Sequence, residues 1–247
     1  MSPIKKKTTK KPSKRPRTSS DSFRNDDVDM AFNDHYKQAP IILERIVDLD
    51  SLKGTFIPDV FKERTWTKLL NPIGDVFKDI IQEFFVNAIV KGDHISCWLK
   101  GREFSIMRES MQDILEIRTT TLDISLQYDE RREKLEPLIE ILGGQLKEKN
   151  LHTITFTPEM WALAYIMIFN LYSVKNLKNL SGPRTIFLFD LFTYKEINIC
   201  SHIYHLFIKS ITKRNSTTIL KHCHVSYFKV KGEDSKWISS NAKGRSY

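Results

Sequence analysis

The sequence has few of the features that mark secreted, membrane-spanning or disulfide-rich proteins. It holds three cysteines, Cys97, Cys200 and Cys223, and an odd number at such wide spacing excludes a disulfide framework. The longest apolar run, Met160–Phe169, is shorter than the ~20 residues that a membrane span needs. No apolar segment follows Met1, which predicts that a signal peptide is absent. These absences predict a soluble protein of a reducing, intracellular compartment.

The sequence also lacks the motifs that carry common catalytic chemistry. It contains no glycine-rich phosphate loop and no nucleophile elbow. The pair Gly143-Gly144 is interpreted as the end of a helix. We therefore expect no catalytic residue and no cofactor.

Two short clusters of cysteine and histidine raise the alternative of a zinc site. They comprise Cys200, His202 and His205, and His222, Cys223 and His224. A zinc site needs four converging ligands, which usually come from spaced pairs. Cys200 and His202 are two positions apart in a predicted helix, so their side chains point in different directions. The spacing therefore favours core or surface positions over a metal site.

A further alternative is the two-metal chemistry of a transposase or nuclease. That chemistry needs carboxylates that hold two metal ions about 4 Å apart. Asp190 follows the apolar run Thr185–Phe189, which would fit a β-strand that carries the first carboxylate. Pro183 favours a helix start instead, and the apolar face continues to Phe192. No second pair of a strand and a carboxylate occurs, so the sequence favours a helix here.

Positive charge is concentrated at the N-terminal end of the chain. The protein has 39 basic and 30 acidic residues, which gives a net charge of +9. The first twenty residues contain no acid and eight of the basic residues: Lys5, Lys6, Lys7, Lys10, Lys11, Lys14, Arg15 and Arg17. Removing these eight from the 39 leaves 31 basic against 30 acidic residues, so the rest of the chain is close to neutral. The body of the protein therefore gives no electrostatic case for a nucleic-acid-binding face.

The basic clusters of this tail are typical of a nuclear-import signal. Closely spaced cations offer many charge-assisted contacts to the acidic groove of an import receptor. The same cations could contact the phosphates of a nucleic acid without sequence preference. A third alternative is a solvated tail that only aids solubility. Import is favoured, and it predicts a nuclear protein, with a cytoplasmic location as the alternative.

The pattern of apolar residues predicts a mainly α protein, with a single helical domain, a small β-hairpin and disordered termini. Residues 1–38 form a tail that is basic and then acidic, and its few apolar side chains predict disorder. Residues 39–230 form the predicted helical domain. Residues 231–247 are polar and are expected to be disordered as well.

The clearest helical pattern covers Asp75–Ala88, with Asp75 as the N-cap and apolar residues along one face. The hairpin is predicted over His94–Leu99 and Arg102–Ser105, around the turn Lys100-Gly101. Ser105 is predicted to cap the helix that follows. Other helices are predicted over residues 58–70, 106–115, 135–142, 157–172, 183–192 and 197–211, with 217–230 as a helix or an extended segment.

The segment Met160–Tyr172 is apolar on almost every side, which predicts a central, buried helix. Trp66, Trp98 and Trp161 all lie in apolar runs. This context favours core positions over platforms on which nucleic-acid bases stack.

Two groups of motifs resemble a known family. The first group comprises Arg64-Thr65-Trp66, Val76–Ala88, Gly101–Ser105 and Met111–Leu115. The second comprises Trp161, Asn170, Leu171, Thr185–Thr193, Glu196–Cys200 and Ile203, with Cys200 where a glycine is usual. From about Ile57 to Phe228 the chain resembles the "putative plant transposon protein" domain of retrotransposon-derived plant proteins.

The resemblance implies a protein derived from a transposable element, and it implies no catalytic or binding residues. Together with the basic tail, it predicts a non-enzymatic interaction or structural module in the nucleus. The expected partners are an import receptor and a nucleic acid, both bound through the tail, and another protein; no membrane is expected. The alternatives are a degenerate transposase or nuclease-like domain, and a non-specific nucleic-acid-binding module that acts through the tail.

Overall fold

The computed structural model describes residues 22–38, 45–71, 77–117, 134–148, 150–172 and 177–212. Several sequence-based predictions lie outside these residues. They are the basic tail, the N-cap Asp75, the segment 217–230 with its cluster His222-Cys223-His224, and the C-terminal residues 231–247.

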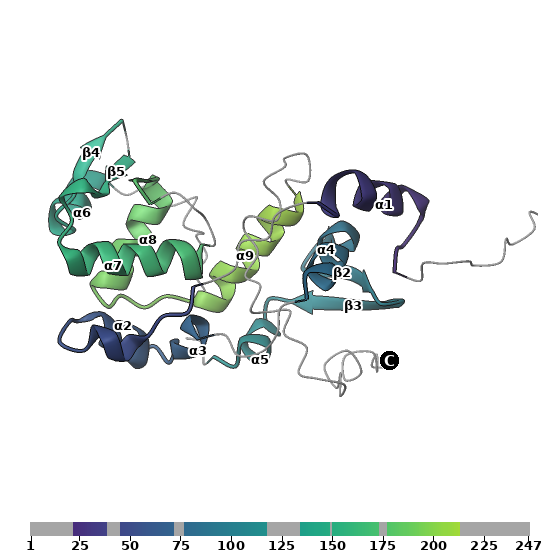
Figure 1. Ribbon diagram of the computed structural model, residues 1–247, viewed down its shortest axis with the longest axis horizontal. Helices are drawn as coiled ribbons and strands as arrows, with labels where there is room; N and C mark the ends of the chain where they lie inside the picture. Colours follow the sequence, from purple (N-terminus) through teal and green to yellow (C-terminus); the bar gives the residue numbers. More distant parts are fainter. Residues whose placement is uncertain are drawn as a thin grey trace, which may run out of the picture.

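The described chain contains helices and short strands, which come in runs of one kind along the sequence (Figure 1). The α-helices are α1 Asp26–Ala31, α2 Ile57–Glu63, α3 Thr67–Leu70, α4 Lys78–Asn87, α5 Met111–Leu115, α6 Leu135–Ile141, α7 Pro158–Ile166, α8 Gly182–Phe192 and α9 Ile199–Thr212. The π-helical turns are η1 Phe32–Tyr36 and η4 Met167–Leu171, and the 3-10 turns are η2 Leu49–Leu52 and η3 Thr153–Thr155. The strands are β1 Ile89–Lys91, β2 His94–Leu99, β3 Arg102–Met107, β4 Gln145–Lys147, β5 Asn150–His152 and β6 Asn179–Leu180.

The prediction of a mainly α fold with one hairpin is wrong. The structure has two three-stranded antiparallel sheets, β1-β2-β3 and β4-β5-β6, and is therefore mixed α/β. The predicted hairpin is confirmed as β2 and β3, and its turn residues Lys100 and Gly101 both have positive φ. The remaining four strands are only two or three residues long, which is too short for a recognisable alternation of apolar and polar side chains.

The end of the first sheet also corrects a helix boundary. Ile106 was expected to be helical, but it pairs with Ile95 as part of β3. Ser105 lies opposite Ser96 in the sheet and does not cap a helix. The helix α5 begins only at Met111, after a turn in which the Ser110 hydroxyl binds the backbone of Met107.

The predicted disorder of the N-terminal segment does not hold for residues 22–38, which form α1 and η1. Two buried amide side chains of α4 hold this segment in place. Asn87 donates to the Ser22 carbonyl at 2.8 Å and accepts from the Arg24 amide at 3.1 Å. Gln82 donates to the Lys37 carbonyl at 3.2 Å. A buried amide without partners would be costly, so the segment and α4 stabilise each other.

The helix α9, the longest α-helix among the described residues, lies between two groups of elements (Figure 1). One group holds α6, α7, α8 and the second sheet, and the other holds α4 and the first sheet. The buried side chains of both groups and of α9 belong to one continuous core. The helical pattern predicted for residues 197–211 is confirmed by α9, whose side chains are mostly buried.

Capping residues set the ends of the two helices beside the second sheet. Thr157 caps α7 by accepting from the Met160 amide at 3.2 Å, and Pro158 occupies its first turn, as predicted. Gly143 has a φ of 70° directly after α6, which confirms the predicted helix stop. In the part of the chain described by the structure, we find no helix with the length and apolar character needed to cross a membrane.

Candidate functional site

Three aromatic side chains form a ladder along one face of α7 and η4. Trp161, Tyr165 and Phe169 follow at four-residue spacing, which places them above one another on a helix. The rings of Trp161 and Tyr165 stack with centroids 5.2 Å apart, and those of Tyr165 and Phe169 are 4.4 Å apart. Trp161 is 46% exposed, so its prediction as a core residue is wrong.

The other two predicted core tryptophans differ in burial. Trp66 is buried, as expected, and Trp98 is half-buried in β2. The expectation for Trp161 failed because α7 is apolar on almost every side. Met160, Leu163 and Ala164 supply the face that enters the core, and this leaves the equally apolar ladder on the outer face.

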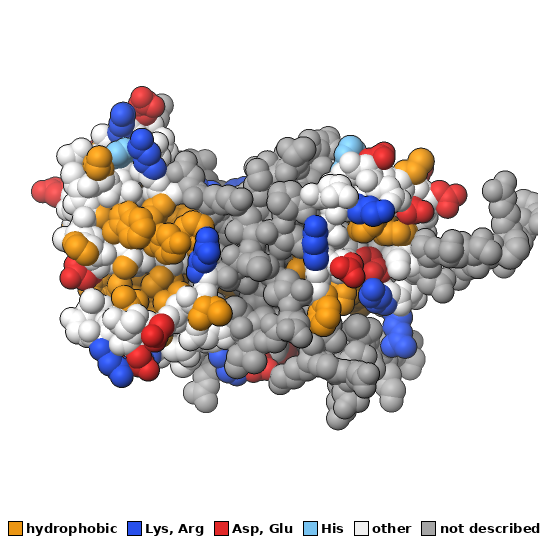
Figure 2. Space-filling view, in the orientation of Figure 1, with side chains coloured by type: hydrophobic (Ala, Val, Ile, Leu, Met, Phe, Trp, Pro, Cys, Tyr) orange, Lys and Arg blue, Asp and Glu red, His pale blue; other side chains and the backbone are white. Residues whose placement is uncertain are grey.

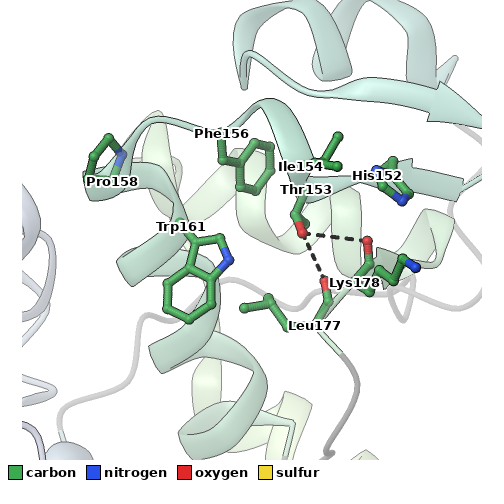
Figure 3. Close-up of a pocket in the computed structure, with 8 residues that line it drawn as sticks. All are labelled: His152, Thr153, Ile154, Phe156, Pro158, Trp161, Leu177 and Lys178. Atoms are coloured by element: carbon green, nitrogen blue, oxygen red, sulfur yellow. Dashed lines mark hydrogen bonds between the residues drawn. The ribbon is translucent and has the colours of Figure 1, made fainter.

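A hollow of about 620 Å³ opens beside Trp161 (Figure 3). Its lining residues are His152, Thr153, Ile154, Phe156, Pro158, Trp161, Leu177 and Lys178. Trp161 enters the hollow from α7, with Phe156 and Leu177 on neighbouring segments (Figure 3). None of the lining residues is acidic, and His152 and Lys178 are basic.

The wall of the hollow is fixed by the hydroxyl of Thr153, which begins η3. It lies 3.3 Å from the Leu177 carbonyl and 3.4 Å from the Lys178 carbonyl, and these bonds join η3 to the segment before β6. The tight turn then directs Ile154 outward, where it is 74% exposed. The exposed side chain of Ile154 therefore extends the apolar surface beside Trp161.

The ladder ends near Arg45, which lies shortly before η2 in the sequence. The Arg45 guanidinium carbon lies 5.6 Å from the centre of the Phe169 ring. The Arg45 backbone is held there because its carbonyl accepts from the Asn170 side chain at 2.6 Å. The next residue, Ile46, is 82% exposed. An exposed aliphatic residue therefore stands near each end of the ladder, Ile154 beside Trp161 and Ile46 next to Arg45.

We refer to Ile154, Trp161, Tyr165, Phe169 and Ile46 together as the α7 surface. Figure 2 shows hydrophobic side chains gathered beside and over α7 in the left-hand part of the molecule. Basic residues accompany both ends of the surface, with His152 and Lys178 at the hollow and Arg45 at Phe169. Apolar and aromatic side chains of this kind, with a polar rim, are typical of recognition sites.

The zinc candidates that the structure describes, Cys200, His202 and His205, lie in α9 and not on α7. Cys200 is buried in α9, and burial raises the pKa of its thiol to about 12, which disfavours the thiolate that binds metal. The His202 ring packs against Tyr172 and Phe187, with centroids 4.7 Å away in both cases. Within the residues that the structure describes, no three His, Cys, Asp or Glu side chains cluster in a way that could hold a metal ion.

Asp190, the candidate for two-metal chemistry, lies in α8, so the helical interpretation of this stretch is confirmed. Its buried carboxylate lies 3.5 Å from the Lys195 ammonium. That ammonium also lies 4.7 Å from the centre of the Phe189 ring. Asp190 therefore helps to hold the chain that follows α8.

The α7 surface could have been found in the sequence by one signal, which is the four-residue spacing of Trp161, Tyr165 and Phe169.

The chain is similar to a known protein family. The model of a family described as "Putative plant retrotransposon-related domain" matches residues 62–226. No curated protein and no solved structure matches the chain.

Proposed function

Because this chain belongs to the family of plant retrotransposon-related domains, we propose that it is a non-enzymatic protein-docking module of a transposable-element-derived protein, with the α7 surface as its docking site. The observation that carries the proposal is the exposed Trp161, which stacks on the half-buried Tyr165 beside the apolar hollow. Large aromatic side chains dominate the binding energy of protein interfaces, and Trp and Tyr are the residues most enriched there.

The position of the surface supports this proposal. Its aromatic rings stand on a helix whose other face is fixed in the core, so they are held in place before a partner arrives. Rigid aromatic anchors lose little conformational entropy on binding. The proposed role is assembly of an element's protein complex.

The proposal also places the protein in the nucleus, with the tail Lys5–Arg17 as the import signal and as a contact for nucleic-acid phosphates. The support is the concentration of eight basic residues in that tail, against a nearly neutral remainder. Docking through the α7 surface and contacts through the tail would be separate functions of separate parts of the chain.

In the experiment, short random peptides displayed on phage are selected for binding to the full chain. We expect selected peptides to lose at least about tenfold in affinity for the Trp161→Ala variant, because truncating a central aromatic anchor typically costs about 2 kcal/mol or more. Met107→Ala is the matched control, since Met107 is about as exposed as Trp161 but lies on β3. Peptides that bind the wild type and Trp161→Ala equally well would contradict docking at this surface.

A further inference from the structure

We propose that the partner of the α7 surface is a protein segment in which a large apolar side chain is flanked by acidic residues. This inference rests on the proposed docking function and specifies the chemistry of the partner. The apolar anchor would enter the hollow beside Trp161, and the acidic residues would lie near the basic residues at the two ends of the ladder.

The shape of the surface sets the form of the segment. The hollow is lined mainly by apolar groups, among them Ile154, Phe156 and Leu177, which suit an aliphatic or aromatic side chain. From Pro158 to Leu171 the helix and its π-helical turn are continuous. At 1.5 Å per residue this stretch is about 20 Å long. A partner that follows the whole ladder would be about six residues long if extended, or about fourteen if helical.

The charges at the surface set the sign of the flanking residues. Lys178 lines the hollow, and the Arg45 guanidinium lies at the opposite end, against Phe169. Glu159 is an acidic residue of the first turn of α7, but it is two positions from Trp161 and so faces away from the ladder. Complementary charge therefore favours a partner that is acidic on both sides of its apolar anchor.

The same features favour a protein segment over a single-stranded nucleic acid. Nucleic-acid grooves combine aromatic platforms with cations that follow the phosphate backbone. Here Trp161 already stacks on Tyr165, and the aliphatic side chains of Ile154 and Leu177 line part of the hollow. An apolar side chain gains more from those walls than a polar base edge does.

The test repeats the selection of displayed peptides with the full chain and then measures their binding to variants in which one charge is reversed. We expect peptides selected by the wild type to combine a large apolar residue with Asp or Glu. Their affinity should fall about fivefold for Lys178→Glu, and should weaken when NaCl is raised from about 50 to about 500 mM, because exposed charges are screened by salt. Lys62→Glu, on the exposed side of α2, is the matched control with the same change of charge. Binding through the basic tail would respond equally to both reversals.

The outcomes separate this inference from the proposed function. Peptides that need Trp161 but lack acidic residues, and that bind Lys178→Glu as well as the wild type, would overturn the inference and leave the docking function intact. Selection of no peptide that depends on Trp161 would overturn both. In parallel, the wild type and Trp161→Ala are titrated with a fluorescent oligo(dT) strand. If the wild type binds this strand and Trp161→Ala does not, the partner of the α7 surface would be a nucleic acid and not a protein segment.

Discussion

Replacing Phe84 by alanine is expected to lower the free energy of unfolding by about 4 kcal/mol, as is typical for removing a buried aromatic ring. Phe84 is fully buried in α4 and joins three elements. The centre of its ring lies 6.3 Å from that of Phe104 on β3 and 6.0 Å from that of Phe207 on α9. The truncation would leave a cavity where α4, the first sheet and α9 meet.

The measurement is urea unfolding of the full chain, followed by circular dichroism. Phe77→Ala is the control, because Phe77 precedes the same helix but is 43% exposed. We expect this change to cost less than about 1 kcal/mol, since little apolar area is removed from the core. Equal losses for Phe77→Ala and Phe84→Ala would contradict the packing described for α4 and α9.

Replacing Arg64 by alanine is expected to cost about 3 kcal/mol, through the loss of several charge-assisted hydrogen bonds and two ring contacts. The guanidinium donates to the carbonyls of Asp190, Leu191 and Lys195 at 3.1–3.4 Å. It also lies 5.6 Å from the ring centre of Trp66 and 5.2 Å from that of Tyr194. Arg64 therefore caps the end of α8 from the end of α2.

The variant Arg64→Lys separates charge from shape. Lysine keeps the positive charge but has no planar fork with which to reach several carbonyls. We therefore expect Arg64→Lys to lose most of the free energy of unfolding that Arg64→Ala loses. The control is Lys62→Ala, an exposed change in the same helix, with an expected effect below about 0.5 kcal/mol. If Arg64→Lys were as stable as the wild type, the forked contacts to α8 would not be the stabilising feature.

This arrangement gives a physical account of one motif on which the family resemblance rested. Arg64 and Trp66 lie together in the sequence, and the structure brings them to the C-terminal end of α8, far along the chain. Trp66 is buried and stacks with the guanidinium, so both residues of the motif act in packing. The motif is therefore structural.

The sequence correctly predicted the parts of the fold in which a helical apolar pattern continues over many residues or in which a capping or turn signal is strong. The pattern over 197–211 and the pair Thr157-Pro158 predicted α9 and the start of α7 correctly. The turn at Gly101 revealed β2 and β3. The second sheet escaped prediction because its strands have at most three residues, which is too short for an alternation of apolar and polar side chains.

The candidate site escaped prediction for a different reason. The spacing of Trp161, Tyr165 and Phe169 was visible, but α7 is apolar on almost every side, so its sequence does not say which face enters the core. That choice depends on long-range packing around α7. The same holds for residues 22–38, whose order depends on Gln82 and Asn87 of α4.

The central claim is that the α7 surface is where a protein partner binds. Hydroxyl-radical footprinting of the full chain tests it most directly, with and without a saturating amount of the tightest selected peptide. We predict that protection from oxidation will be confined to Ile154, Trp161, Tyr165 and their neighbours along α7, with Met30 and Met107 as exposed internal references. Protection at Met30 or Met107, with unchanged oxidation of Trp161, would contradict the account.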